Sequence, residues 1–179
     1  MDVGGGTSEL AVTALGGMVV SASVQVGGYD LDDAIVRSLQ EEQMLLIGQE
    51  QAEQLKLEIG SAFEGAEATL SAEVAGRDLS TGLLRRAAVD SSQVRQAVAR
   101  PLAQIVGSVE DLLERTPAEL SADIAARGLM LVGGSTLLPG FAELLRRETQ
   151  LAVSRDPEPL TTVARGAGAA LEQSGRRGR

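Results

Sequence analysis

The residues best suited to binding a charged ligand lie at the start of the chain, around a run of three glycines. Residues 4–6 have no Cβ, so their backbone N–H groups can converge on an anion. Thr7 follows and offers a hydroxyl to a phosphate. Asp2 and Glu9 flank the run with carboxylates that can hold a hydrated divalent cation. This spacing predicts a phosphate-binding loop with a metal beside it.

A second glycine turn lies far along the chain. The apolar run 129–132 predicts a strand buried on both faces, Gly133-Gly134-Ser135 follows it, and a helix is expected at 138–148. Free N–H groups at the start of a helix attract anions and polar ligand atoms. Each glycine turn also has a purely structural interpretation, as a hairpin turn or as a strand-to-helix turn capped by Ser135 or Thr136. Their joint occurrence favours ligand binding.

The composition limits both the core and the chemistry. Of the 179 residues 44% are hydrophobic but only 2% are aromatic, so the core must consist of Leu, Val, Ile and Ala, which suits α/β layers. The chain has no His and no Cys, which excludes a His-based triad and a His- or Cys-ligated zinc. A net charge of −9 argues against a nucleic-acid surface. Since no signal peptide or membrane-spanning run is found, a cytoplasmic location is expected.

The elements that must position the two turns alternate between strands and helices. Strands are expected at 1–3, 7–13, 18–26, 66–74, 83–89, 129–132 and 151–154. Helices are expected at 30–44, 49–59, 138–148 and 161–173, with a long helix from Ser91 or Ser92 that includes Leu112 and a short one starting at Thr116-Pro117.

Several local features of this pattern are specific enough to test. Asp30 is expected to cap the first helix, and Ser91 or Ser92 the long one. Pro101 predicts a kink or a break inside the long helix. Residues 45–48 are expected to form a connector and 76–78 a polar turn. The Gly- and Arg-rich tail 174–179 is expected to be disordered.

In combination, the two turns resemble motifs of the actin-like ATPase superfamily. The run Asp2-Val3-Gly4-Gly5-Gly6-Thr7 is similar to its second phosphate motif, and Leu131-Val132-Gly133-Gly134-Ser135 is similar to its adenosine motif. The chain between them most resembles the MreB-like bacterial actins, and the matching segments are 26–32, 52–62 and 116–124. The resemblance extends from Asp2 to about Leu171, with the motifs in the family's order and spacing.

The resemblance implies an α/β fold, namely the second, ribonuclease H-like half of an actin-like ATPase. Residues 1–29 and 91–173 would form the nucleotide-binding domain, and 30–90 a small inserted α+β subdomain. The implied function is that of the C-terminal part of an ATP-binding, filament-forming protein of cell-shape determination. Its implied partners are ATP, Mg²⁺, further copies in a filament and the cell-shape machinery at the inner membrane, but no nucleic acid.

The resemblance also implies a role for each site residue. Gly4, Gly5, Gly6 and Thr7 would hold the β- and γ-phosphates, Asp2 would reach the metal through water, and Glu9 would lie in the shell beyond. Glu53 and Lys56, three residues apart on one helix face, would meet the ribose or adenine, and Gly133, Gly134 and Ser135 would let the backbone pass close to the adenosine. The sequence alone favours a solvated pair on an acidic helix for Glu53 and Lys56, and only the family resemblance reverses that preference.

Two departures from the family pattern matter. The adenosine motif of MreB-like proteins usually has a third glycine where this chain has Ser135, and the Gly-Gly-Ser form also occurs in the seventy-kilodalton heat-shock chaperones. The family's first phosphate loop, water-positioning residue and membrane-inserting segment have no counterpart here, so we expect little ATP hydrolysis by this chain alone. The alternatives are the nucleotide-binding half of a chaperone, a small-molecule kinase of the superfamily, or a non-enzymatic α/β domain.

Overall fold

The computed structural model describes residues 1–65 and 69–177. Its strands are β1 (Asp2–Val3), β2 (Ser8–Ala14), β3 (Gly17–Val24), β4 (Leu45–Leu46), β5 (Ser71–Asp78), β6 (Leu84–Asp90), β7 (Leu129–Leu131) and β8 (Val153–Arg155). Its α-helices are α1 (Gly28–Gln43), α2 (Gln49–Ile59), α3 (Ser91–Glu114), α4 (Ser121–Arg127), α5 (Phe141–Thr149) and α6 (Thr162–Arg177). Two 3₁₀ turns, η1 (Ala118–Leu120) and η2 (Gly134–Leu137), precede α4 and α5.

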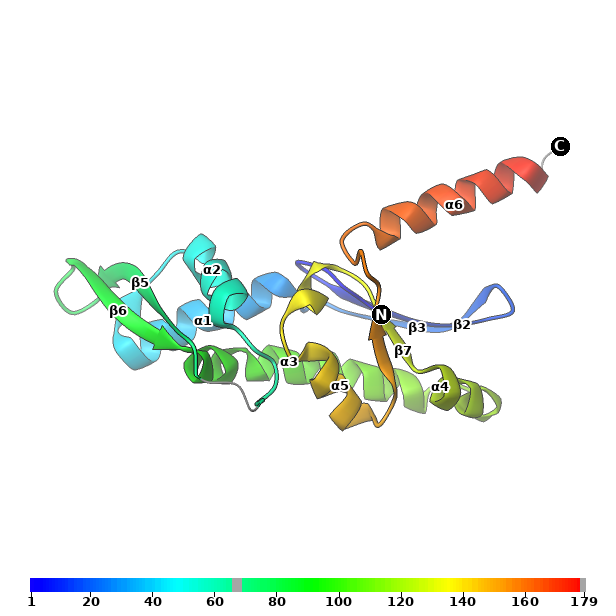
Figure 1. Ribbon diagram of the computed structural model, residues 1–179, viewed down its shortest axis with the longest axis horizontal. Coiled ribbons are helices and arrows are strands. Elements are labelled where there is room, and N and C mark those ends of the chain that lie inside the picture. Colours follow the sequence, from blue (N-terminus) through cyan, green and yellow to red (C-terminus); the bar gives the residue numbers. More distant parts are fainter. Residues whose placement is uncertain (66–68, 178–179) are drawn as a thin grey trace.

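The larger sheet combines an antiparallel meander with two parallel strands. β1, β2 and β3 pair antiparallel in that order, and β7 pairs parallel with β8. The two parts are joined because Val3 N–H donates to the Val132 carbonyl at 2.9 Å and Val132 N–H donates to the Met1 carbonyl at 2.8 Å. The strand order is therefore β3-β2-β1-β7-β8, with both glycine turns at the ends of the central strands (Figure 1).

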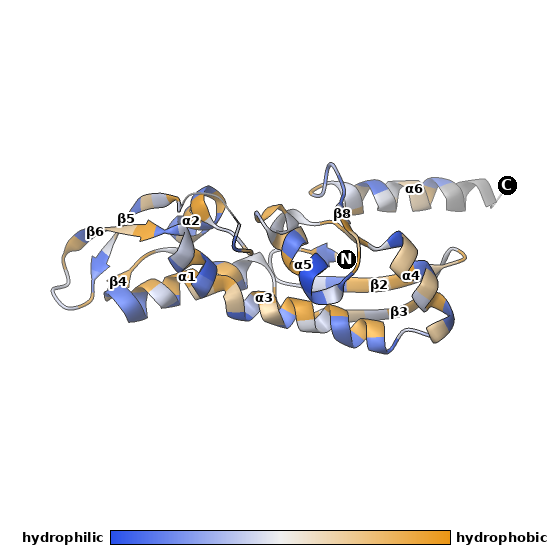
Figure 2. Cartoon of the chain, turned by 60° about the horizontal axis from the view of Figure 1, so that its bottom comes forward, coloured by the Kyte–Doolittle hydropathy of each residue, from blue (hydrophilic) through white to orange (hydrophobic). Residues whose placement is uncertain are grey.

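A smaller antiparallel sheet, of order β4-β5-β6, lies at the opposite end of the molecule beside α1 and α2 (Figure 1). The long helix α3 connects the two ends, since it contacts α1, α2 and β6 as well as β2, β3 and α5. Hydrophobic and hydrophilic residues alternate along α3 (Figure 2), and its buried positions follow a helical period. These are Val94, Val98, Pro101, Leu102, Ile105, Val106, Val109 and Leu112.

Helix α2 matches its expected bounds of 49–59, but the starts of two other helices differ from expectation. Gly27, not Asp30, is the N-cap of α1, and the Asp30 carboxylate accepts a hydrogen bond from Gly27 N–H at 2.8 Å. The N-cap of α3 is Asp90, whose carboxylate accepts from Gln93 N–H at 2.9 Å. In both helices an acidic side chain satisfies N–H groups that would otherwise lack a partner, so it fixes the first turn.

The expected connector at 45–48 and the expected turn at 76–78 are both wrong. Leu45 and Leu46 form β4, and residues 76–78 lie inside β5, where Arg77 and Asp78 pair with these two leucines. The hairpin turns later because Asp78 accepts hydrogen bonds from the N–H groups of Ser80 and Thr81 at 2.9 and 3.0 Å. Residues 66–68 of the expected strand lie outside the described residues.

Three further expectations need correction. Helix α3 continues through Pro101, because the apolar residues on both sides of it are buried; the alternative of a break is therefore wrong, and the alternative of a kink stays a prediction. Strand β7 is not buried on both faces: Leu131 is buried, but Met130 on the other face is 52% exposed. Helix α6 runs on to Arg177, so residues 174–177 continue it; Ala and Arg are good helix formers, and one Gly costs only about 1 kcal/mol. Residues 178–179 lie outside the described part of the chain.

Candidate nucleotide-binding site

The carbonyl of Gly4 connects the first glycine turn to two segments that are distant in sequence, the first turn of α1 and the second glycine turn. It accepts a hydrogen bond from Gly28 N–H at 3.0 Å and another from the Ser135 hydroxyl at 2.8 Å. Tyr29 N–H donates to the next carbonyl, that of Gly5, at 2.8 Å. The two glycine turns, 131 residues apart in sequence, therefore contact each other and the first turn of α1.

This close packing explains why glycine occupies particular positions. A Cβ on Gly27 would lie 2.6 Å from the Gly5 carbonyl oxygen, and one on Gly133 would lie 2.2 Å from a carboxylate oxygen of Asp2. Gly133 also has a φ of 90°, which side chains rarely allow. Any larger residue at these two positions would separate the turns.

The outer surface of the first turn is open to solvent. Gly5, Gly6 and Thr7 are exposed, and a Cβ on Gly6 would meet nothing within 4 Å. Gly4 N–H closes the turn by donating to the Thr7 carbonyl at 2.9 Å. Among the described residues none accepts a hydrogen bond from the N–H of Gly5 or Gly6. Two backbone donors are therefore free for an anion at this surface.

The two acidic residues of the loop lie side by side. Asp2 on β1 and Glu9 on β2 are direct cross-strand partners, so their side chains share one face of the sheet. Glu9 accepts a hydrogen bond from the Ser23 hydroxyl at 2.9 Å, and the half-buried Asp2 lies against Gly133. Within the described residues no group of three or more potential ligands of the Asp, Glu, His or Cys type is found.

Lys56 lies behind the loop in a buried ion pair. Its ammonium is 2.8 Å from a carboxylate oxygen of Asp32 and donates to the Gly28 carbonyl at 3.2 Å. Burial raises the pKa of the Asp32 carboxyl, while the hydrogen bond and the charge of Lys56 act to lower that pKa. Lys56 therefore links α2 to the first turn of α1, where Gly28 N–H donates to the Gly4 carbonyl.

Lys56 does not form the solvated pair with Glu53 that was the alternative interpretation of their spacing, since Glu53 is exposed while Lys56 is buried. Sequence reasoning had not singled out Asp32 as a site residue. The available signal was its position: Asp32 lies four residues after Gly28 and three before Ile35, on the buried stripe of α1. A charged residue on such a stripe needs a buried partner, and Lys56 is that partner.

Ser135 and Gly134 differ in their surroundings. The Ser135 hydroxyl is committed to the Gly4 carbonyl, and a Cβ on Gly28 would lie 2.7 Å from it. Gly134 lies next to Leu160, which follows β8. The buried Thr136 hydroxyl donates to the Gly133 carbonyl at 2.7 Å, so it stabilises η2 rather than facing a ligand. The site thus combines free backbone donors, two carboxylates and a close-packed glycine turn.

An α/β chain with these two linked glycine turns is typical of actin-like nucleotide-binding proteins, and comparison with known proteins identifies the family. The model of the MreB/Mbl protein family matches residues 1–178. The cell shape-determining protein MreB of Escherichia coli K12 is 44% identical over 172 residues, which cover 96% of this chain and 49% of that protein. The cell shape-determining protein Mbl of Bacillus subtilis is 38% identical, over 96% of this chain and 51% of its own. This chain therefore belongs to the MreB/Mbl family.

Solved structures agree with this assignment. MreB5 of Spiroplasma citri bound to ADP has a TM-score of 0.94 at 32% identity, over 98% of this chain and 53% of its own. The same protein bound to AMPPNP has a TM-score of 0.93 at 31% identity, over 99% of this chain and 54% of its own. The MamK double helical filament, at 22% identity and a TM-score of 0.78, shares the fold.

The chain spans about half the length of the curated relatives it matches. Its α/β structure accordingly matches about half of the actin-like MreB fold. In the part of the chain that the structure describes, no helix has the length and apolar character needed to cross a lipid bilayer.

Proposed function

We propose that this chain forms the second, ribonuclease H-like half of an actin-like fold. The sheet of order β3-β2-β1-β7-β8 supports this proposal, because an antiparallel meander followed by parallel strands is what we expect of such a domain. Residues 1–29 and 91–173 would form this domain. Residues 30–90, which include the small β4-β5-β6 sheet, would form the inserted subdomain.

The site would bind ATP. The free N–H groups of Gly5 and Gly6 carry this proposal, since they are exposed beside Thr7 at a turn that the fold holds rigidly through Gly4. Gly4, Gly5, Gly6 and Thr7 would hold the β- and γ-phosphates. The turn Gly133-Gly134-Ser135 would lie along the adenosine. The binding of AMPPNP and ADP by MreB5 of Spiroplasma citri supports this assignment.

The two loop carboxylates fit a magnesium ion that accompanies the phosphates. Mg²⁺ keeps several of its waters and is usually held by one or two carboxylates together with phosphate oxygens. Asp2 and Glu9 share a face of the sheet beside the loop, so they suit contacts through water. When bound, the ion would offset the negative charge that the phosphates bring near these carboxylates.

On the other side of the site, Glu53 and Lys56 of α2 would lie toward the ribose or adenine. Glu53 is exposed and free to accept hydrogen bonds from ribose hydroxyls. Lys56 is held by Asp32, so its contribution would be to fix the Gly28 carbonyl and the first turn of α1 beneath the nucleotide.

At the level of the whole protein, we propose that the chain is part of a filament-forming bacterial actin of cell-shape determination, acting with cell-shape machinery at the inner membrane. The names of its MreB and Mbl relatives and the filament formed by MamK support this role. Membership in the MreB/Mbl family argues against the chaperone and small-molecule kinase alternatives. Because Gly5, Gly6 and Thr7 are open to water, we expect slow ATP turnover by the chain alone.

A charge placed at the loop surface tests nucleotide binding. Gly6→Asp fits without a clash, since open space surrounds this position, but its carboxylate would repel phosphates. We expect the wild-type chain to bind a fluorescent ATP analogue saturably with Mg²⁺, and Gly6→Asp to bind it at least about tenfold more weakly at an unchanged melting temperature. The control Gly166→Asp places the same charge at another open glycine, in α6. Equal binding by wild type and Gly6→Asp would contradict the site.

A further inference from the structure

The side chain of Tyr29, in the first turn of α1, lies against the glycine loop. Its backbone N–H donates to the Gly5 carbonyl at 2.8 Å. A Cβ on Gly5 would lie 2.9 Å from two atoms of the Tyr29 ring and 3.3 Å from the hydroxyl oxygen. The ring therefore occupies the space that a side chain at position 5 would fill, and glycine at that position lets the ring and the loop touch.

Tyr29 is nevertheless open to solvent, since 68% of the residue is exposed. Within residues 1–65 and 69–177, no group forms a hydrogen bond with its hydroxyl. A tyrosine hydroxyl both donates and accepts hydrogen bonds, while the ring below it is apolar. Tyr29 thus brings an unused donor to the loop whose Gly5 and Gly6 N–H groups are also free.

The charges around the loop make a neutral donor useful there. Asp2 and Glu9 are both acidic, and the nearby ammonium of Lys56 is already paired with Asp32. A terminal phosphate presents several strong acceptor oxygens, and besides backbone N–H groups the loop itself offers only the Thr7 hydroxyl. A further hydroxyl donor would satisfy a phosphate oxygen without adding negative charge to this acidic surface.

We propose that the Tyr29 hydroxyl donates a hydrogen bond to a phosphate of the bound nucleotide, and that the Tyr29 ring shields that side of the loop from water. This inference rests on the proposed nucleotide site, because the N–H groups of Gly5 and Gly6 must hold the phosphate there. A hydrogen bond to a charged oxygen is roughly twice as strong as one between neutral groups. Tyr29 is then a phosphate-binding residue supplied by α1, outside the glycine loop.

The variant Tyr29→Phe tests this contact, since it removes the hydroxyl and keeps the ring. With Mg²⁺ present, we expect it to bind the fluorescent ATP analogue about tenfold more weakly than the wild-type chain does. The melting temperature of the nucleotide-free protein should stay the same, because the hydroxyl has no partner in the described part of the chain. A purely structural role of the hydroxyl would lower that melting temperature instead.

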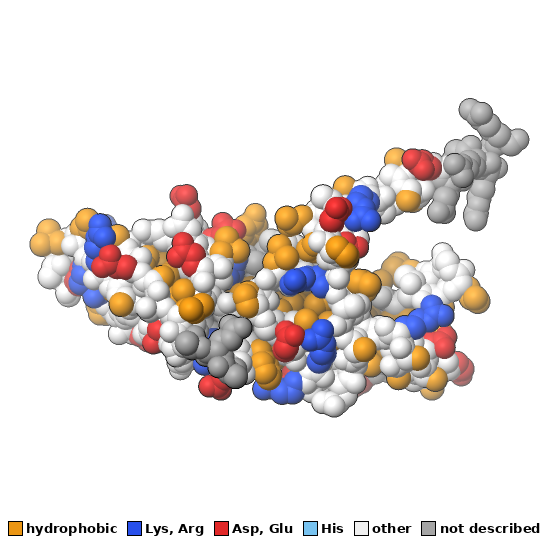
Figure 3. Space-filling model, in the orientation of Figure 1, with side chains coloured by type: hydrophobic (Ala, Val, Ile, Leu, Met, Phe, Trp, Pro, Cys, Tyr) orange, Lys and Arg blue, Asp and Glu red, His pale blue; other side chains and the backbone are white. Residues whose placement is uncertain are grey.

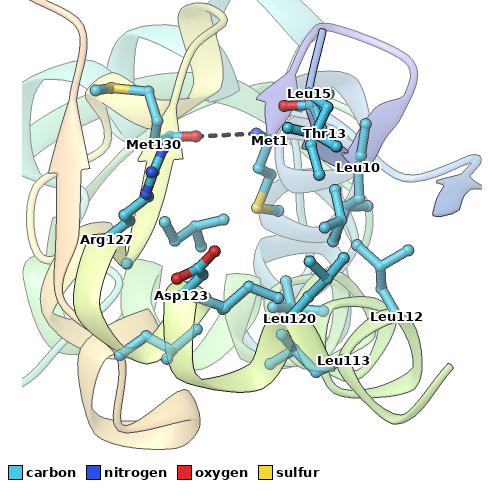
Figure 4. Close-up of a pocket in the computed structure, with 18 residues that line it drawn as sticks. Met1, Leu10, Thr13, Leu15, Leu112, Leu113, Leu120, Asp123, Arg127 and Met130 are labelled. Atoms are coloured by element: carbon cyan, nitrogen blue, oxygen red, sulfur yellow. Dashed lines mark hydrogen bonds between the residues drawn. The ribbon is translucent and has the colours of Figure 1, made fainter. Parts of the chain in front are cut away.

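A matched control removes a hydroxyl elsewhere. Thr13 lies near the other end of β2, where it lines a largely apolar cavity formed with α3, α4 and β7 (Figure 4). Thr13→Val should bind the analogue as the wild type does. Equal affinities of wild type and Tyr29→Phe would overturn the Tyr29 contact and leave the proposed nucleotide site standing. Absence of saturable binding by the wild type would overturn both.

Inorganic tripolyphosphate separates a phosphate contact from an adenosine contact. With Mg²⁺ it should displace the fluorescent analogue from the wild-type chain, although it has no base or sugar. Displacement from Tyr29→Phe should need a tripolyphosphate concentration higher by the same factor of about ten, relative to the affinity of tripolyphosphate for the wild type. If tripolyphosphate bound both proteins equally, or did not displace the analogue from the wild type, a phosphate contact of Tyr29 would be overturned.

Tyr29 also reports on its own surroundings, because the chain has a single Tyr and no Trp. Tyrosine emission therefore comes from this position alone. Saturating ATP with Mg²⁺ should lower the slope with which acrylamide quenches the emission, since a bound phosphate covers the hydroxyl. At the same ATP concentration, Gly6→Asp should keep the slope of the nucleotide-free protein. An unchanged slope in the saturated wild type would overturn the contact.

Discussion

Lys56 and Asp32 form an ion pair with both side chains buried, and no other pair among the described residues shares this property. The pair lies directly behind the glycine loop, where Lys56 also donates to the Gly28 carbonyl. Gly28 in turn donates to Gly4. The glycine loop is thus linked, through Gly28, to a charge pair that does not itself face solvent.

Removing both charges should destabilise the fold by less than the two single removals added together. Asp32→Asn leaves a buried ammonium without its counter-charge, and Lys56→Met leaves a buried carboxylate, so each should cost about 3 kcal/mol of unfolding free energy. The double variant should cost clearly less than the sum of the two. Urea denaturation of the four proteins measures this coupling. Additive costs would show that the pair contributes nothing beyond the two separate side chains.

The close contact of the two glycine turns could be anticipated only through the family resemblance. Each turn is visible in the sequence as a local pattern, but Ser135 and Gly4 are 131 residues apart, and no spacing rule connects them. The burial of Lys56 could not be anticipated from spacing either, because it depends on a partner, Asp32, that lies on a different helix. Sequence periodicity shows which face of a helix is buried, but it does not show which residues of other elements that face contacts.

At the scale of elements, prediction succeeded where a pattern was long. Helix α2 matches its expected bounds because its inward residues Ala52, Leu55 and Ile59 repeat over several turns. Strand β4 was missed because two residues carry no periodicity, and it exists only through pairing with β5. The late hairpin turn was missed because a side chain, that of Asp78, determines where the chain reverses.

Asp78 makes the β5–β6 hairpin sensitive to acid. Hydrogen bonds from Ser80 and Thr81 lower the pKa of its carboxyl to about 2, and Arg85 lies 2.8 Å away. An acid whose pKa is lowered on folding stabilises the fold above its unfolded pKa, about 3.9, and this stabilisation is lost as pH falls through the folded value. We therefore expect the contribution of Asp78 to disappear between about pH 4 and pH 2.

The variant Asp78→Asn tests this dependence. It should lower the melting temperature at pH 6, and the difference from wild type should shrink as the pH falls toward 2. Circular dichroism melts across this range provide the measurement. The control Asp123→Asn changes an exposed carboxylate on α4 and should show a much smaller effect at pH 6. A difference that stays constant down to pH 2 would contradict the role of the ionised carboxylate.

At the scale of the whole molecule, α6 stands apart from the body (Figures 1 and 3). Where burial is described, its residues are exposed apart from the half-buried Thr162, and Val163 and Leu171 present apolar side chains to solvent. Surface ion pairs of Arg165 with Asp156 and Glu158, together with hydrogen bonds at its first turn, link α6 to the segment that precedes it. The body should therefore fold without α6.

A chain ending at Thr162 tests this independence. Surface ion pairs contribute at most about 1 kcal/mol, so the truncation should lower the melting temperature by less than about 4 °C. Nucleotide-analogue binding should persist, because the loop 4–7 and the turn 133–135 are linked through Gly4 and not through α6. A larger drop would mean that α6 packs on the body in solution. If that packing were between copies, the melting temperature of the full chain, but not of the truncated one, would rise with protein concentration.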